Sequence, residues 1–166
     1  MIYYQIKPKQ VKKNILSFDY LPEDYKEIIF KDGLNAITKT LQIESITDYF
    51  HEPFPIISEE FLNTINIYTK TPPKKFVTVS SSQLERDLFY WAVKPRGVDC
   101  LHPETIFDNQ GIVETLVLKK ERIIYEKFFS VQGLPEDCWI VSLDVMESLL
   151  RRGLNGFVGE EVRLEE

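Results

Sequence analysis

Three residues that could do chemistry lie within the stretch "GVDCLHPE" at positions 97–104. Cys100, His102 and Glu104 are two residues apart, so in an extended strand their side chains would share one face. A thiol beside an imidazole can be activated for nucleophilic attack. Thiol enzymes, however, usually bring this pair together in space rather than in sequence. We therefore favour a strand ending at Pro103 with a buried cysteine and a half-exposed histidine, and a small enzyme using Cys100 and His102 is the alternative.

Other kinds of active site have less support. The chain has two histidines and two cysteines, and none of them shows the spacing of a metal site. The glycine patterns that cradle phosphates or dinucleotides are absent from the sequence. We expect no catalytic residue, no metal ligand and no cofactor, and hence a protein that is not an enzyme.

Length and composition limit the classes of protein to which the chain can belong. The 166 residues fit one domain, with a possible division near 69–75, where "TKTPPKK" indicates an exposed connector. No apolar run approaches the roughly 20 residues that a membrane helix requires. The start of the chain lacks the pattern of a secretory signal, and two cysteines are too few for a disulfide framework. These features predict a cytoplasmic protein without a membrane partner.

Acidic charge is concentrated in the last part of the chain. Residues 121–166 hold five basic and ten acidic residues, which accounts for most of the net charge of −6. Binding to nucleic acid needs a basic face, so we expect no nucleic-acid partner. A basic protein partner fits this charge, and a merely soluble acidic surface is the plainer explanation. Glu160 and Glu161 are the candidate partner-binding residues.

A phrase that occurs twice predicts two similar structural units. "PIISEEFLNTI" at 55–65 and "WIVSLDVMESL" at 139–149 each place an apolar pair before a serine, an acid and an apolar helical stripe. Ser58 and Ser142 are good N-caps, and each is expected to contribute about 1 kcal/mol. Leu150 is expected on the buried stripe of the second helix, and Gly153 is placed to end that helix. The phrase therefore predicts a strand, a Ser-capped helix and a further strand.

The remaining pattern is mostly that of β-strands. "MIYYQIK" at 1–7 and "DLFYWAV" at 87–93 fit strands, and Trp91 is either a core residue or a partner contact. "IVETLVLKKERIIYEKFFSV" at 112–131 fits two or three strands, with "KKER" as a polar turn. Residues 8–50 show no clear pattern, and "LNAITKTLQIESITDYF" at 34–50 fits a helix or two short strands. The sequence predicts an α+β fold with a largely antiparallel sheet and a few short Ser-capped helices.

Four stretches between Pro53 and Leu164 resemble a known family in their order. They are "PIISEEFLNTI", "LFYWAVKPRGVDCLHPET", "LVLKKERIIYEKFFSVQG" and "IVSLDVMESLLRRGLNGFVGEEV". Together they look like bacterial immunity proteins of family eleven in the catalogue of polymorphic-toxin systems, earlier filed as a domain of unknown function. In that family the third stretch is similar to a hairpin that ends in a Phe-rich strand. The resemblance supplies no catalytic residues.

The resemblance implies a cytoplasmic antidote that binds and neutralises a cognate toxin protein. An adaptor or chaperone of a secreted effector, or the small enzyme described above, is the alternative. The toxin, the binding face and the oligomeric state do not follow from the sequence.

Overall fold

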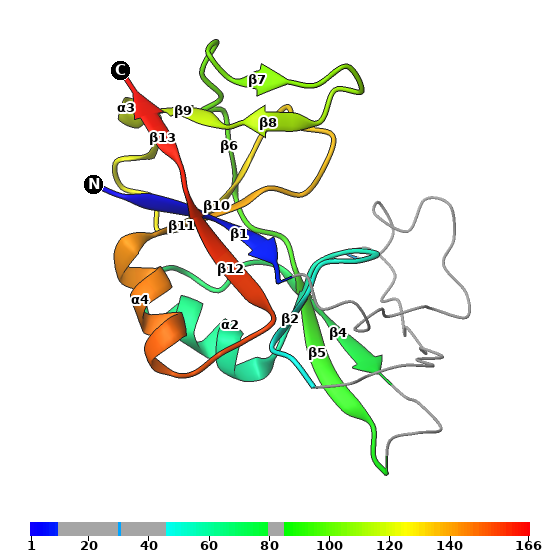
Figure 1. Ribbon diagram of the computed structural model, residues 1–166. Helices are drawn as coiled ribbons and strands as arrows, with labels where there is room; N and C mark the ends of the chain where they lie inside the picture. The colour runs from blue at the N-terminus through cyan, green and yellow to red at the C-terminus, as the bar shows by residue number, and fades with distance from the viewer. Residues whose placement is uncertain (10–29, 31–45, 80–84) are drawn as a thin grey trace.

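The computed structural model describes residues 1–9, 30, 46–79 and 85–166 (Figure 1). Its elements, in chain order, are β1 (Tyr3–Pro8), β2 (Tyr49–Phe50), β3 (Ile56–Ile57), α2 (Glu59–Asn66), β4 (Lys74–Val79), β5 (Leu88–Val93), β6 (Gly97–Val98), β7 (Ile106–Phe107), β8 (Val113–Thr115), β9 (Val117–Lys119), α3 (Lys120–Ile123), β10 (Phe128–Val131), β11 (Trp139–Ser142), α4 (Leu143–Arg151), β12 (Phe157–Glu161) and β13 (Arg163–Glu165). Within the stretch 34–50, residues 34–45 lie outside the described residues, and the chain enters β2 at 49–50.

A five-stranded sheet forms the centre of the fold, with the strand order β12-β1-β11-β10-β6. All its pairs are antiparallel except that of β10 with β6. A second sheet has the order β2-β3-β5-β4 and is antiparallel throughout. The pair β7-β8 is antiparallel and the pair β13-β9 is parallel. The predicted α+β class with largely antiparallel sheets is confirmed.

The central strands are buried on both faces because each has apolar residues at consecutive positions. Side chains of neighbouring strand residues point to opposite faces of a sheet. In β11, Trp139 and Val141 therefore enter one cluster while Ile140 enters another. Phe128 and Phe129 of β10 divide in the same way. The five-stranded sheet is thus a middle layer with a core on each side.

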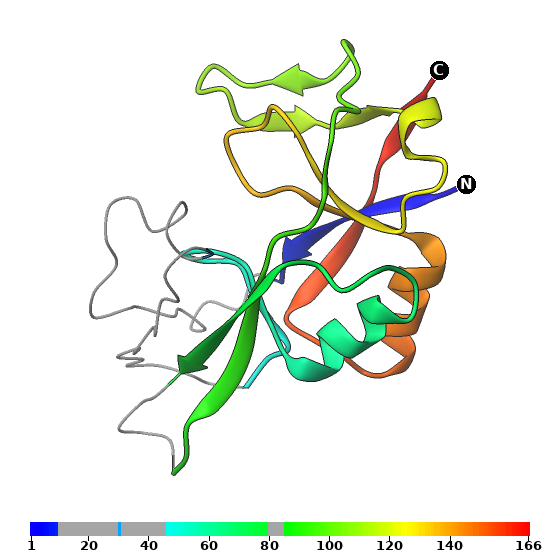
Figure 2. The ribbon, with the colours of Figure 1, turned by 180° about the vertical axis from the view of Figure 1, so that it is seen from behind.

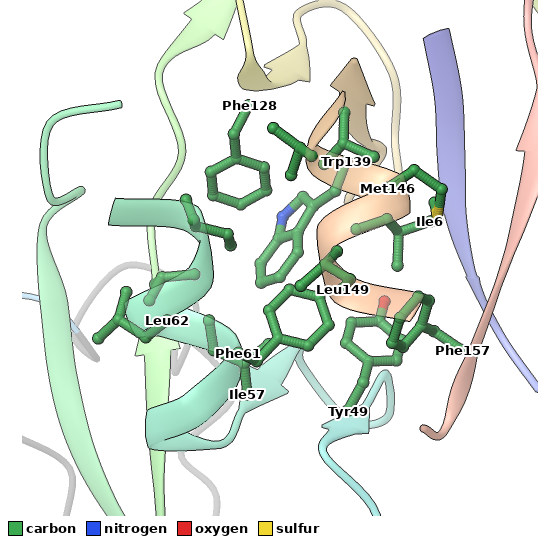
Figure 3. Packing of buried hydrophobic residues seen from close by; sticks show 14 residues of the cluster. Ile6, Tyr49, Ile57, Phe61, Leu62, Phe128, Trp139, Met146, Leu149 and Phe157 are labelled. Carbon is green, nitrogen blue, oxygen red and sulfur yellow. The ribbon is translucent and has the colours of Figure 1, made fainter. Parts of the chain in front are cut away.

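The first core joins both sheets to both longer helices (Figure 3). Phe61 of α2 and Leu149 of α4 pack into it, together with Ile6 and Trp139 of the central sheet. Ile57 brings in the second sheet. Figure 2 shows α2 beside α4, as Figure 1 does from the opposite side. The two copies of the repeated phrase therefore supply one helical layer.

The second core lies on the other face of the central sheet. It includes Leu118 of β9, Ile123 of α3 and Val162, which lies between β12 and β13. The expected polar turn at "KKER" is wrong, because α3 forms there and buries Ile123 completely. The hairpin implied by the resemblance is also absent from the described strands, since β9 pairs with β13 and β10 pairs with β11.

Ser58 and Ser142 make different hydrogen bonds at the starts of their helices. The backbone N–H of Phe61 donates to Ser58 Oγ at 3.2 Å, so this predicted cap is confirmed. Ser58 also donates to Asp48 Oδ1 at 2.8 Å. Ser142 holds the N-cap position, but its hydroxyl makes no cap bond and donates instead to the Asp144 carboxylate. The predicted cap bond of Ser142 is therefore wrong, because the acid two residues later takes its hydroxyl.

The end of α4 agrees in part with what the sequence predicts. Gly153 has a φ of 71°, the left-handed conformation that ends a helix and favours glycine. Leu150, expected on the buried stripe, is 57% exposed, and Val145, Met146 and Leu149 form the buried stripe without it.

We predict that Ser58→Ala lowers the free energy of unfolding by about 1–2 kcal/mol, because it removes a helix cap and a hydrogen bond to a carboxylate. Ser142→Ala should be destabilising only through the lost bond to Asp144. In an Asp144→Ala background it should therefore change stability by less than about 0.5 kcal/mol. Urea unfolding of the single and double variants measures both effects. Equal costs of Ser142→Ala in the two backgrounds would contradict this assignment.

Candidate partner-binding site

A groove with a volume of about 300 Å³ lies beside β12 and β1, the two adjacent strands at one end of the central sheet. Five separate segments line it: β1, β12, the residues after β2, the strand β8 with its neighbours, and the loop between β10 and β11. A Cβ atom on Gly159 would point at Met146 of α4, at 2.6 Å from its methyl carbon. The next residue, Glu160, therefore points to the opposite face of the sheet, where the groove lies.

The groove is strongly acidic. Its lining carboxylates are those of Glu52, Glu114, Glu136, Asp137 and Glu160. Among the described residues of the lining, Lys7 is the one lysine or arginine, and its Nζ lies 2.6 Å from Glu160 Oε2. Within the described part of the chain, none of the other four carboxylates has an ion-pair partner. All five acidic residues are exposed, so these carboxylates of the described lining face solvent.

Of the two predicted partner-binding residues, only Glu160 lines this groove. Glu160 lines it, and its side chain is 59% exposed despite the ion pair. Glu161 is also exposed but is not part of the lining, because neighbouring strand residues point to opposite faces. Glu136 and Asp137 belong to the acidic part of the chain at residues 121–166. The acidic charge of that part is the sequence signal that could have identified them as partner-binding candidates. Glu52 and Glu114 come from elsewhere, and no sequence signal connects them to the groove.

Tyr49 lies behind one wall of the groove. Its hydroxyl shares a hydrogen bond of 2.7 Å with Nδ1 of the lining residue His51. Burial, followed by the charge of Asp137, raises the pKa of Tyr49 well above its ordinary value. Tyr49 is therefore a neutral phenol at physiological pH, and the negative charge of the groove comes from its carboxylates alone.

Cys100 and His102 do not form an activated pair. The expected strand through these residues is wrong, because β6 ends at Val98. Cys100 is fully buried, and burial, with a further contribution from Asp99, raises the pKa of its thiol to about 11. His102 is half-buried, and its Nδ1 accepts a hydrogen bond from the backbone N–H of Glu104 at 3.2 Å. The buried cysteine and half-exposed histidine that we favoured are confirmed.

An aromatic surface lies on a different part of the molecule. Trp139 is buried, whereas Trp91 is partly exposed with the Lys74 ammonium 4.0 Å from the centre of its ring. Phe76 and Phe89 stack beside it and are 44% and 57% exposed. This surface on β4 and β5 carries Lys74 over the Trp91 ring, and the Trp91 indole N–H donates to the Glu59 carboxylate.

Neither a membrane-crossing helix nor a metal-binding cluster is found in the described ranges 1–9, 30, 46–79 and 85–166. None of their helices combines the length and the apolar character needed to span a membrane. No group of three or more histidine, cysteine or acidic residues there is arranged to hold a metal ion.

In comparisons with known proteins, no family model matches the chain, and no curated protein matches it either. The immunity-protein resemblance stays a prediction.

We predict that both thiols react slowly with Ellman's reagent in the native protein at pH 8. Burial raises the pKa of Cys100 to about 11 and that of Cys138 to about 12, so the reactive thiolate is scarce at this pH. For Cys100, a pKa of about 11 instead of 9.0 means about 100-fold less thiolate. Unfolding in guanidinium chloride should release both thiols at the rate of a free cysteine. In Cys138→Ala, fast labelling of the native protein would show that Cys100 is accessible and would contradict this view.

Proposed function

We propose that this chain is an immunity protein that binds and neutralises a cognate bacterial toxin domain. The acidic groove is the observation that carries the proposal. Five carboxylates converge there from four segments, and among the described lining residues one lysine opposes them. Such a surface attracts a basic protein, and it agrees with the partner that the family resemblance implies. The partner is therefore a toxin domain with a basic face, and the antidote acts in the cytoplasm.

The physical role of the groove is to speed and orient encounter with the toxin. Complementary charge raises the association rate and suppresses wrong partners more than it adds to affinity. Toxin domains that attack nucleic acid need basic surfaces to hold their substrate. An antidote that covers this basic surface blocks the substrate without any chemistry of its own. Binding alone is thus sufficient for neutralisation.

An adaptor or chaperone of a secreted effector would use the same groove for a basic client. It differs from an immunity protein in one respect, because a client must keep its activity when bound. The enzyme alternative needs an activated nucleophile, and the buried Cys100 thiol does not provide one.

The deciding experiment is co-expression of the chain with the cognate toxin domain, which the proposal expects to be encoded beside it. Cells that carry both should grow, whereas cells that carry the toxin alone should die. A matched variant, Glu136→Lys with Asp137→Lys, should lose protection while its circular dichroism stays that of the wild type, because both side chains are exposed. Death of cells in which the chain still co-purifies with active toxin would favour the adaptor.

We further predict that association with the toxin slows several-fold as salt rises from low to molar concentration, because the Debye length falls from about 10 Å at 0.1 M to about 3 Å at 1 M. Glu136→Gln with Asp137→Asn should flatten this dependence. Glu160→Gln should have a smaller effect, since Lys7 already balances that carboxylate. Stopped-flow measurement of the association rate against ionic strength tests the set. Glu121→Gln is the control, because Glu121 is exposed but outside the groove. A flat association rate would contradict electrostatic steering.

A further inference from the structure

Among the strands that the structure describes, β12 has one open edge. It pairs with β1 on one side and is the last strand in the order of the central sheet. The N–H of Val162 donates to the carbonyl of Tyr3 at 2.9 Å, and the N–H of Lys9 donates to the carbonyl of Gly156 at 3.0 Å. In an antiparallel pair the residues that bond to the neighbour alternate with residues that do not. The residues of β12 whose backbone groups face away from β1 are therefore Phe157, Gly159 and Glu161.

This edge is accessible along most of its length. In the described part of the chain, no strand other than β1 pairs with β12. Val158 is 44% exposed, and the three residues that follow it are exposed as well. Figure 1 shows β12 as the red strand in front of β1, running toward the C-terminus. An exposed edge with unpaired N–H and C=O groups is a template for a further strand.

The charge beside the edge selects what can pair with it. An edge-to-edge dimer would bring Glu160 and Glu161 of both copies to the shared edge, and like charges there oppose pairing. A basic strand would instead gain from these two residues and from the groove next to them. Glu160 and Val158 point to the groove face, so an added strand would place every second side chain beside the carboxylates.

We propose that the open edge of β12 binds an extended, lysine- or arginine-rich segment of the partner as an added β-strand. Main-chain hydrogen bonds to Phe157, Gly159 and Glu161 supply affinity, and alternate cationic side chains contact the groove. The proposal rests on the proposed function for the identity of the partner as a toxin, and it adds the mode of binding.

The first test uses the wild-type protein and synthetic peptides about eight residues long, the length of an ordinary strand. The basic peptide alternates lysine with valine, and the control alternates glutamate with valine. In amide NMR spectra the basic peptide should shift the signals of Phe157, Gly159 and Glu161, and the acidic peptide should not. Methylation of the backbone nitrogens along one edge of the basic peptide removes hydrogen-bond donors but no charge, and it should abolish the shifts. Unchanged binding of the methylated peptide would mean purely ionic contact and would overturn the proposal.

The second test separates the binding mode from the proposed function. Glu161→Pro removes an outward N–H on an edge strand, whereas Glu161→Ala removes the charge and keeps the N–H. Glu161→Pro should weaken toxin binding about tenfold and Glu161→Ala much less, consistent with one lost hydrogen bond. Full toxin binding by a folded Glu161→Pro variant would overturn the strand pairing and leave the immunity function intact. Shifts with the basic peptide but no protection from toxin would overturn the function and leave the edge site intact. A dimer of the chain through this edge in sedimentation would overturn the choice of partner.

Discussion

The packing around Trp139 is the interaction on which the rest of the structure depends. Its ring meets Phe128 of the central sheet at 5.4 Å and Tyr49 of the second sheet at 6.0 Å between ring centres. Tyr49 also packs edge-on against Phe157 at the start of β12. One aromatic cluster therefore fixes the second sheet against the first. It also fixes the groove, because His51 follows Tyr49 by two residues and lines the groove together with Glu160 of β12.

The groove can stay acidic because its charges remain in water. Five carboxylates close together would be costly in a core, where charge must be paired. Here each of these residues is exposed, and solvent screens the repulsion between them. The rigid layers beneath supply the stability that this surface does not. A surface that gains little from its own charges is free to gain from those of a partner, which is the physical basis for the binding role proposed.

Sequence reasoning succeeded where a structure is set by local pattern. The strand–helix–strand units and the cap at Ser58 follow from neighbouring residues alone. It failed where contacts between residues far apart in the sequence determine the local structure. Lys119–Arg122 reads as a turn, but burial of Ile123 in the second core makes α3 a helix. Of the carboxylates that line the groove, only Glu160 was predicted as a partner-binding residue, since Glu52 and Glu114 join the groove through the tertiary fold.

The position of β1 between β11 and β12 has a consequence for biosynthesis. β1 is made long before β11 and β12, its two partners in the sheet. On the ribosome it stays without its neighbours until nearly all of the described chain has emerged, so the central sheet closes late. Contacts between residues so far apart in sequence slow folding. For the proposed immunity role, the protein would therefore have to be folded before the toxin arrives.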